Sequence, residues 1–388
     1  MSKKLNVVLA LACGLILANL YYAQPLISAI SESLGLNEAA GGLIVTLAQS
    51  GYVLGILLIV PLGDKLENRG LIRFLIFGSS LALLLVGLAS PKVVVMPAFF
   101  LLGLFTSVVQ LIIPYGVSLA AEDQRGQAIG LIASGAILGI VLSRPVAGFL
   151  TGWFTWRACF LISGGLLVVV GIFFRRLPVK DAPPAAQPYL TVLSSMAGMI
   201  KSNRLLRRKI GAMALVFSGF SLFWSAAPLY LNTKLGFSHP EVALVSLTSL
   251  AAPVCTILAG RLADRGLGFI TAAIGMAAAS IGFLLTPIFG AQAVLFVLSV
   301  LLLDCDTHTA SLVTQQSVIT IDAQARSRLN ALYMAGMFGG GALGSAVGPW
   351  LFSHYGWGAA AWAGFALSVF GLAFHISQKL SKTKKCLN

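Results

Sequence analysis

Three titratable residues lie close together in one apolar stretch of the second half of the chain. Asp304, Asp306 and His308 fall within five positions. If the stretch is helical, Asp304 and His308 share a face, whereas Asp306 points about 200° away from Asp304. Burial disfavours the charged form of a carboxylate, and histidine titrates near neutral pH. This group could therefore bind and release a proton.

A structural role is the alternative for each member of this group. One carboxylate could be locked in a salt bridge, with Arg144 as a possible partner, and His308 could be a packing residue. Arg144 is the only basic residue that we place inside an apolar run, where a charge costs at least about 2.5 to 3.5 kcal/mol on insertion scales. We expect Arg144 to face protein or a cavity. If its helix ends early, the side chain would instead reach the outer surface.

The elements that position these residues are set by composition. Of 388 residues, 58% are hydrophobic and 10% are charged, against roughly 25% charged in soluble domains. Apolar runs of about 18 to 25 residues recur with almost no charge, which is long enough to span hydrocarbon. Lipid offers the backbone no hydrogen-bond partner, and the runs lack the alternation of barrel strands. The sequence predicts an all-α integral membrane protein.

We predict twelve transmembrane helices in two bundles of six. The expected spans are residues 5–29, 40–62, 72–90, 93–119, 126–149, 156–174, 208–232, 241–261, 268–288, 291–318, 328–351 and 357–378. The predicted domains are an amino-terminal bundle (1–175), a cytoplasmic linker (176–207), a carboxyl-terminal bundle (208–378) and a basic cytoplasmic tail (379–388).

The distribution of basic residues predicts the orientation. With a cytoplasmic amino terminus, the loops on that side hold all 26 Lys and Arg except Lys92, Arg144, Arg157 and Lys234. The positive-inside rule then places both termini in the cytoplasm. Because the basic residues are scattered among membrane-flanking loops, the net charge of +14 is an orientation signal, and we expect no nucleic-acid partner.

The two halves repeat at an offset near 200 residues. The loop Leu62-Gly63-Asp64-Lys65 matches Leu262-Ala263-Asp264-Arg265. Further matches are Arg125 with Arg326, Gly135 with Gly336, and Trp156 with Trp357. Six spans per half make the copies parallel repeats about an axis along the membrane normal, with a cavity expected between them at the midplane.

These motifs resemble those of the major facilitator superfamily over essentially the whole chain. The loop from Pro61 to Gly70 resembles the short signature loop of that family, with a fainter copy at residues 260–266. The glycines and proline of residues 135–148 resemble the motif of its drug/proton antiporter branch, and residues 19–26 resemble bacterial members. The branch usually has an arginine early in its fourth span, and residues 93–119 contain none.

The resemblance implies roles for two groups of residues. The signature loops would form a conformational latch, with topology and helix capping as the alternative. The latch residues are Asp64, Lys65, Arg69, Asp264 and Arg265. In the fifth span, Gly135, Gly139 and Gly148 recur on or near one face and should pack tightly against a partner helix. Pro145 removes a helical hydrogen bond and should create a pivot.

Polar residues within spans either line a solute cavity or bond between helices. The cavity candidates are Tyr22, Gln24, Gln110 and Gln315. The five cysteines (Cys13, Cys159, Cys255, Cys305 and Cys386) lack disulfide or metal-ligand spacing and are expected to be packing residues. Phosphate-binding loops, metal clusters and nucleophile elbows are absent from the sequence. We therefore expect no enzyme activity, no cofactor and no metal.

The expected protein is a monomeric secondary active transporter of a bacterial inner membrane that works by alternating access. Proton-coupled efflux of a small organic compound is the leading interpretation. A solute/proton symporter or uniporter for a sugar or organic acid is the first alternative. A non-transporting membrane sensor is an alternative from another class, although it would not require titratable groups at mid-span.

Overall fold

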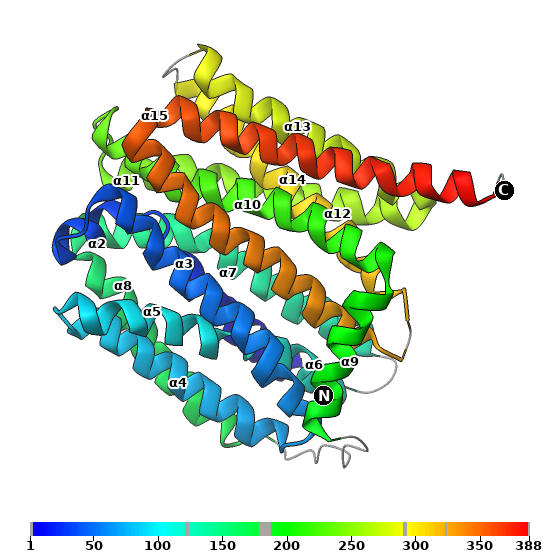
Figure 1. Ribbon diagram of the computed structural model, residues 1–388. Coiled ribbons are helices and arrows are strands. Elements are labelled where there is room, and N and C mark those ends of the chain that lie inside the picture. The colour runs from blue at the N-terminus through cyan, green and yellow to red at the C-terminus, as the bar shows by residue number, and fades with distance from the viewer. Residues whose placement is uncertain (1–2, 121–123, 178–187, 290–292, 323, 387–388) are drawn as a thin grey trace. The chain divides into compact units, whose positions relative to one another are not determined.

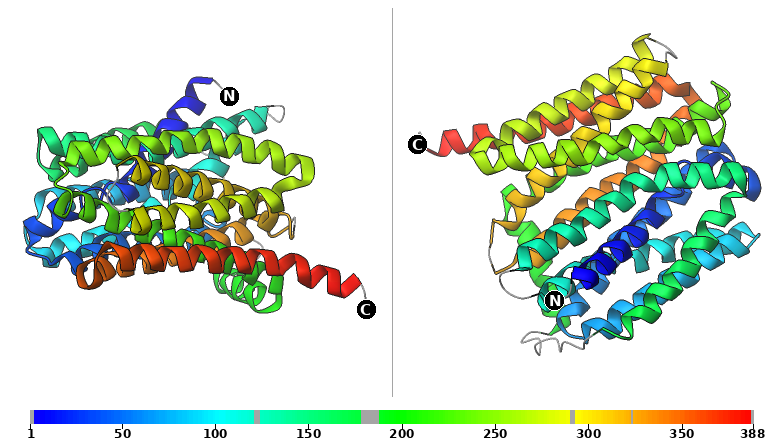
Figure 2. Two further views of the ribbon diagram at one scale, coloured as in Figure 1. Left: turned by 90° about the horizontal axis from the view of Figure 1, so that it is seen from above. Right: turned by 180° about the vertical axis from the view of Figure 1, so that it is seen from behind.

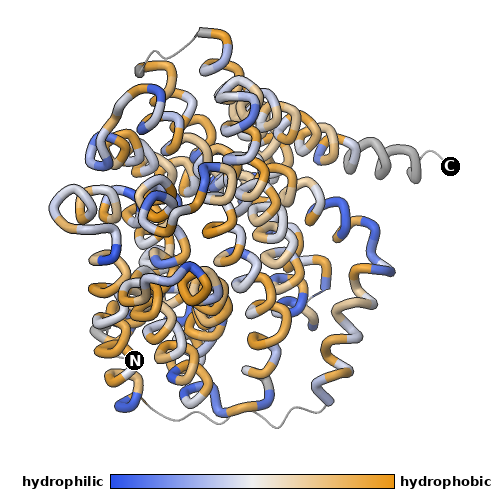
Figure 3. The backbone as a smooth tube through the Cα atoms, turned by 60° about the vertical axis from the view of Figure 1, so that its left-hand side comes forward, coloured by the Kyte–Doolittle hydropathy of each residue, from blue (hydrophilic) through white to orange (hydrophobic). Residues whose placement is uncertain are grey.

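The computed structural model describes residues 3–120, 124–177, 188–289, 293–322 and 324–386. Within these ranges every regular element is a helix (Figure 1). The helices are coloured as hydrophobic along most of their length (Figure 3). This arrangement satisfies backbone polar groups inside each segment, as hydrocarbon requires.

The helices follow one another from end to end of the described chain. Those of the first half are α1 (Lys3–Tyr21), α2 (Ile27–Leu34), α3 (Glu38–Leu54), α4 (Asn68–Leu88), α5 (Lys92–Thr106), α6 (Val109–Leu119), α7 (Arg125–Trp153) and α8 (Trp156–Phe174). Those that follow are α9 (Tyr189–Ser202), α10 (Arg204–Thr233), α11 (His239–Ser246), α12 (Ala252–Leu262), α13 (Gly268–Phe289), α14 (Ala293–Ile319) and α15 (Arg326–Cys386). Short π or 3-10 turns are η1 (Gly55–Ile59), η2 (Val60–Asp64), η4 (Leu247–Ala251) and η5 (Ala263–Leu267).

The number of membrane crossings agrees with the prediction. Among the described residues, nine helical stretches are long and apolar enough to cross a membrane, and Leu5–Tyr21 is a shorter apolar helix. Two of the nine, His239–Ile288 and Arg326–Ser377, have 50 and 52 residues. At 1.5 Å per residue each is about 75 Å long, enough for two crossings of a hydrocarbon core of about 30 Å. Together these stretches account for twelve crossings.

Two glycines mark the corners inside those long stretches. Gly266 has a φ of 82° and Gly356 a φ of 79°. An L-residue with a side chain rarely adopts this left-handed region, whereas glycine does so without steric cost. The chain can therefore reverse between consecutive crossings at these positions.

Four predicted spans are not single α-helices. Two of them, 40–62 and 241–261, contain the π or 3-10 turns η1, η2 and η4, and the other two are interrupted by turns. The first, 5–29, is interrupted because α1 ends at Tyr21, and turns precede α2, which begins at Ile27. Pro25 in this segment has no N–H to continue a helical ladder. The fourth, 93–119, is interrupted after Thr106, where the Ser107 hydroxyl donates to the carbonyl of Leu104. This local bond competes with regular helix geometry.

Contacts between residues divide the chain into two compact units. Unit 1 comprises Met1–Leu36, Leu47–Leu193 and Ser238–Ala243, and unit 2 comprises Asn37–Thr46, Ser194–Phe237 and Leu244–Asn388. The predicted domain limits at 175, 207 and 378 stay a prediction. In particular, residues 178–187 of the expected linker and the side chains of the basic tail lie outside the described part of the chain.

The same helix pairings occur in both units. In unit 1, α1 packs against α7 and α4 against α8; in unit 2, α10 packs against α15 and α13 against α15. Figures 1 and 2 show α4 and α8 side by side in different views. These pairs occupy corresponding places in the repeat, so the duplication seen in the sequence extends to helix packing.

Glycines allow the closest of these contacts. A methyl group at Gly139 would overlap the carbonyl oxygen of Gly14, and one at Gly135 would overlap that of Ala10. In unit 2, Gly340 and Gly344 lie in the same way against the backbone of α10, at Ala214 and Ser218. Small residues let helix backbones approach closely in membranes.

Gly148 has a different neighbour, and the expectation that it lies near the face of Gly135 and Gly139 is wrong. A methyl group at Gly148 would lie 2.6 Å from Cβ of Ala243 and 2.9 Å from the carbonyl oxygen of His239. Nine residues separate Gly139 from Gly148, which corresponds to about half a turn around the helix. Gly148 therefore packs against α11, while α7 continues through Pro145 to Trp153.

The packing of α1 against α7 gives a stability prediction. Gly139→Ala should lower the free energy of unfolding by about 1 to 3 kcal/mol because its methyl group meets backbone that cannot rotate away. Gly130→Ala is the matched control on the same helix, since nothing lies within 4 Å of its added methyl group. It should be neutral or stabilising by up to about 1 kcal/mol. Unfolding in detergent measures both, and equal stability of the two variants would contradict the close contact.

Candidate functional site

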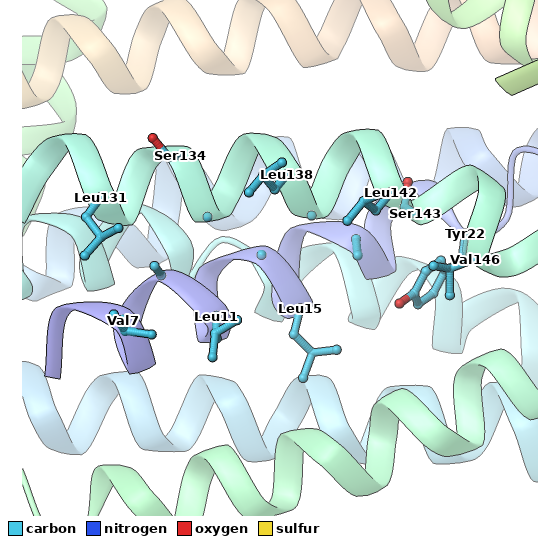
Figure 4. Close-up of a pocket in the computed structure, with 15 residues that line it drawn as sticks. Val7, Leu11, Leu15, Tyr22, Leu131, Ser134, Leu138, Leu142, Ser143 and Val146 are labelled. Atoms are coloured by element: carbon cyan, nitrogen blue, oxygen red, sulfur yellow. The ribbon is translucent and has the colours of Figure 1, made fainter. Parts of the chain in front are cut away.

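Unit 1 contains an apolar groove between α1 and α7, with a volume of about 470 Å³. Its lining residues are Val7, Ala10, Leu11, Gly14, Leu15, Ala18, Tyr22, Leu131, Ser134, Gly135, Leu138, Gly139, Leu142, Ser143 and Val146. Figure 4 shows Tyr22 and Val146 at one end and Val7 and Leu131 at the other. The volume falls within the range of small-molecule pockets, and Tyr22 is one of its few polar groups.

Arg144 lies in the interior of unit 1. Its side chain is 1% exposed, and its Nε donates a hydrogen bond of 3.0 Å to Oε1 of Gln24. The guanidinium carbon lies 5.6 Å from the centroid of the Tyr21 ring, where the ring face attracts a cation. The alternative of an outer-surface position is therefore wrong. Arg144 is also not among the groove-lining residues, so it faces protein.

The glutamine candidates bond between elements. Gln24 accepts from Arg144 on α7, as described above. Gln110 on α6 donates to the hydroxyl of Tyr52 on α3 at 3.2 Å. Gln315 on α14 donates to Oδ1 of Asn330 on α15 at 2.7 Å. Of the four cavity candidates, Tyr22 is the one that lines the described groove.

In unit 2, Asp304 is the centre of a buried polar cluster. Its side chain is 1% exposed. Oδ1 accepts a hydrogen bond of 3.0 Å from Nε1 of Trp224 on α10, and Oδ2 accepts one from the hydroxyl of Ser249 in η4. Both donors are neutral, and bonds to a charged acceptor are stronger than neutral ones. The cluster joins three helical elements through one carboxylate.

Asp306 has a different environment, as its position on the helix predicts. It is 2% exposed, and its Oδ1 is buried with no hydrogen-bond partner among the described residues. A methyl group at Gly275 on α13 would lie 2.8 Å from that oxygen, so the glycine makes room for the carboxyl group. His308 is half-buried on the same helix.

Sequence reasoning did not identify Ser249 and did not assign Trp224 to Asp304. A buried carboxylate requires donors, because an unsatisfied one costs several kcal/mol. That requirement signals the existence of partners, but it does not say which of many hydroxyl and indole groups on other helices supply them.

The proposed latch residues are held in different ways. On α4, Nη1 of Arg69 donates to the carbonyl of Leu177 at 3.0 Å, and its Nε pairs with Oε1 of Glu67 at 3.2 Å. Asp264 and Arg265 are exposed, and Lys65 is half-buried. The side chain of Asp64 lies outside the described residues. Arg69 thus connects the start of α4 with the segment after α8.

Comparison with known proteins identifies the family. Residues 9–325 match the Major Facilitator Superfamily. This match covers most of the chain, which therefore belongs to that family. The fold class expected from the sequence, twelve transmembrane helices in two pseudo-symmetric bundles, is confirmed.

Individual relatives are similar over nearly the full length. An uncharacterized transporter, YgaY, from Escherichia coli O157:H7 is 33% identical over 375 residues, covering 96% of this chain and 95% of the relative. A probable sugar efflux transporter from Pasteurella multocida is 27% identical, covering 90% and 86%. The crystal structure of the nucleoside transporter NupG has a TM-score of 0.74 at 16% identity, covering 96% of this chain and 98% of that one. At that identity the likeness shows the fold alone.

Family membership establishes the broad class of the protein. It is a membrane-spanning transporter of a small-molecule substrate and not an enzyme. The groove of unit 1 and the Asp304 cluster of unit 2 are the features whose chemistry can be tested within this class.

The Asp304 cluster gives a stability prediction. Trp224→Phe keeps an aromatic ring but removes the indole donor, so the free energy of unfolding should fall by about 1.5 to 3 kcal/mol. Trp153→Phe is the control, because Trp153 is 78% exposed. Denaturant unfolding in detergent compares the variants. An effect of Trp224→Phe no larger than that of the control would contradict a structural bond to Asp304.

Proposed function

We propose that this protein is a proton-coupled exporter of a small organic compound that works by alternating access. It would belong to the drug/proton antiporter branch and act as a monomer in a bacterial inner membrane, with both termini in the cytoplasm. The observation that carries the proposal is Asp304, a carboxyl group buried in a membrane-spanning helix between two neutral donors.

Proton coupling follows from the chemistry of that carboxyl group. An ionisable side chain within a transmembrane helix is expensive and is by default a functional hypothesis. The hydrogen bonds described for Asp304 come from Trp224 and Ser249. These neutral donors stabilise the carboxylate without cancelling its charge. Protonation would remove an acceptor site and weaken the connection among α14, α10 and η4.

Further residues are proposed to take part in the proton pathway. Asp306 and His308 are the nearest candidates on α14, and Arg144 is the candidate in unit 1. Oδ1 of Asp306 is buried without a hydrogen-bond partner among the described residues. A protonated carboxyl group is compatible with this position, because the neutral form avoids an uncompensated buried charge. In this proposal Asp306, His308 and Arg144 act together with Asp304 in the proton pathway.

Export is supported by one named relative and by the groove. The Pasteurella multocida relative is named a probable sugar efflux transporter. The groove offers Tyr22 and an apolar wall, while Gln24, Gln110 and Gln315 remain candidates for contacts with a solute. A symporter or uniporter for a sugar or organic acid is the alternative, and it differs in the direction in which solute and proton move.

Two structural parts are proposed to support the transport cycle. Asp64, Lys65, Arg69, Asp264 and Arg265 would latch one conformational state. Gly135, Gly139, Pro145 and Gly148 would form the packing and pivot region of α7, because close glycine contacts allow helices to move without separating large side chains.

Proton coupling can be tested by replacing the carboxyl group. Asp304→Asn retains the shape but does not titrate, so solute-driven proton movement should fall to background. The measurement uses vesicles with reconstituted protein and a pH-sensitive dye inside, to which solutes of several classes are added. Asp322→Asn is the matched control, because Asp322 is exposed and should retain proton movement.

Several outcomes would contradict the proposal. Solute transport by Asp304→Asn with unaltered pH dependence would exclude coupling through this residue. Proton movement in the same direction as solute would favour symport. Absence of a response to every solute class in the unsubstituted protein would favour uniport or a non-transporting sensor.

The latch can be tested separately from coupling. Asp64→Asn should lower the transport rate while leaving the amount of protein in the membrane unchanged, because it alters a switch between states and not the packed bundle. Glu32→Gln, at an exposed position, is the control. Transport by Asp64→Asn at the unsubstituted rate would refute the latch.

A further inference from the structure

Two cysteines that are far apart in the sequence meet between α12 and α14 of unit 2. Cys255 lies on α12 and Cys305 on α14, two helices that pack against one another, and the two thiols are close enough to interact. Both thiols are partly exposed, in contrast to Cys13 and Cys159, which are buried. The two thiols form a pair that the surrounding protein leaves partly uncovered.

A second contact fixes the position of the pair. Ser249, in the η4 turn that leads into α12, donates to Asp304, the residue next to Cys305 on α14. The thiol pair and the Asp304 cluster therefore connect the same two segments of the chain. A group that bridges the two sulfur atoms would be attached to α14 at the residue next to Asp304.

The residues around Cys255 and Cys305 limit which ligands the two thiols can bind. The described residues contain no group of three His, Cys, Asp or Glu side chains suited to a metal ion, whereas a structural zinc site uses four ligands. Asp304 and Asp306 flank Cys305 and act on it electrostatically. Two thiolates around a monovalent ion would add net negative charge beside these carboxyl groups, within apolar helices. An uncharged product avoids that cost.

We propose that Cys255 and Cys305 form a two-sulfur site for a trivalent arsenic or antimony centre. The reaction with an organic arsenoxide replaces the oxygen on arsenic by two sulfur atoms. Two As–S bonds form, and the two thiol protons leave with the oxygen as one water molecule. Arsenic stays trivalent and no electron is transferred. The product is neutral.

This proposal goes beyond the proposed transport function and does not depend on it. Binding requires only the two thiols and access to them. Because α12 and α14 belong to different crossings, a covalent bridge would cross-link them and restrict the unfolded chain, which raises stability. The adduct should therefore raise the midpoint of thermal unfolding.

The test uses purified full-length protein in detergent with phenylarsine oxide as the probe. A Cys386→Ser background removes the fifth cysteine. Intact-protein mass spectrometry should show one arsenic adduct per chain, accompanied by a higher unfolding midpoint. The dithiol 2,3-dimercaptopropanol should remove the adduct and reverse the shift, whereas an equal concentration of a monothiol should not, because two bonds must be replaced.

Matched variants decide which thiols are used. Cys255→Ser and Cys305→Ser should each abolish the stable adduct, while Cys13→Ser and Cys159→Ser should retain it. N-ethylmaleimide should still modify the remaining thiol of each of the first two variants, which shows that it is accessible. The corresponding alanine variants repeat the test if a serine variant does not fold.

Two results would overturn the site. One is an adduct that survives removal of either Cys255 or Cys305, because a bridge needs both sulfur atoms. The other is the absence of any adduct on the Cys386→Ser protein, whether or not maleimide reacts with it.

Discussion

The structure depends on one constraint, which is that hydrocarbon offers no hydrogen-bond partner to the peptide backbone. Each crossing must satisfy its own N–H and C=O groups, and every regular element among the described residues is accordingly helical. The same constraint removes the hydrophobic effect as a force between helices, so cohesion depends on close packing. The glycines at 139 and 340, set against backbone of α1 and α10, provide that packing.

Buried charged side chains, like the backbone, need partners within the protein. Arg144 lies against an amide oxygen and a tyrosine ring, and Asp304 accepts from an indole and a hydroxyl group. The two donors described for Asp304 are neutral. Neutral partners lower the cost of burial without fixing the charge state as an opposite charge would. The carboxyl group of Asp304 is thus accommodated in the fold without an opposite charge among its described hydrogen-bond partners.

The architecture was predictable from the sequence because its signals are local. The length of the apolar runs predicts the transmembrane helices. A spacing of four residues places Gly135 and Gly139 on one face of their helix. The site was predictable only in part. Asp304 stands out as an acid in an apolar run, but Ser249 and Trp224 come from other helices, 55 and 80 positions away. Contacts between helices depend on how each helix is rotated about its axis and how deep it lies in the membrane. The residue pattern within one helix does not determine either. The meeting of Cys255 with Cys305 escaped prediction for the same reason.

The two units share their helix packing but differ in their buried charges. In both copies glycines pack closely between two helices, α1 with α7 and α10 with α15. A buried cation is present at Arg144 in one copy, and buried acids are present at Asp304 and Asp306 in the other. A buried charge therefore does not follow from the repeated packing, and each unit acquires its own chemistry from residues that have no counterpart of the same charge in the other.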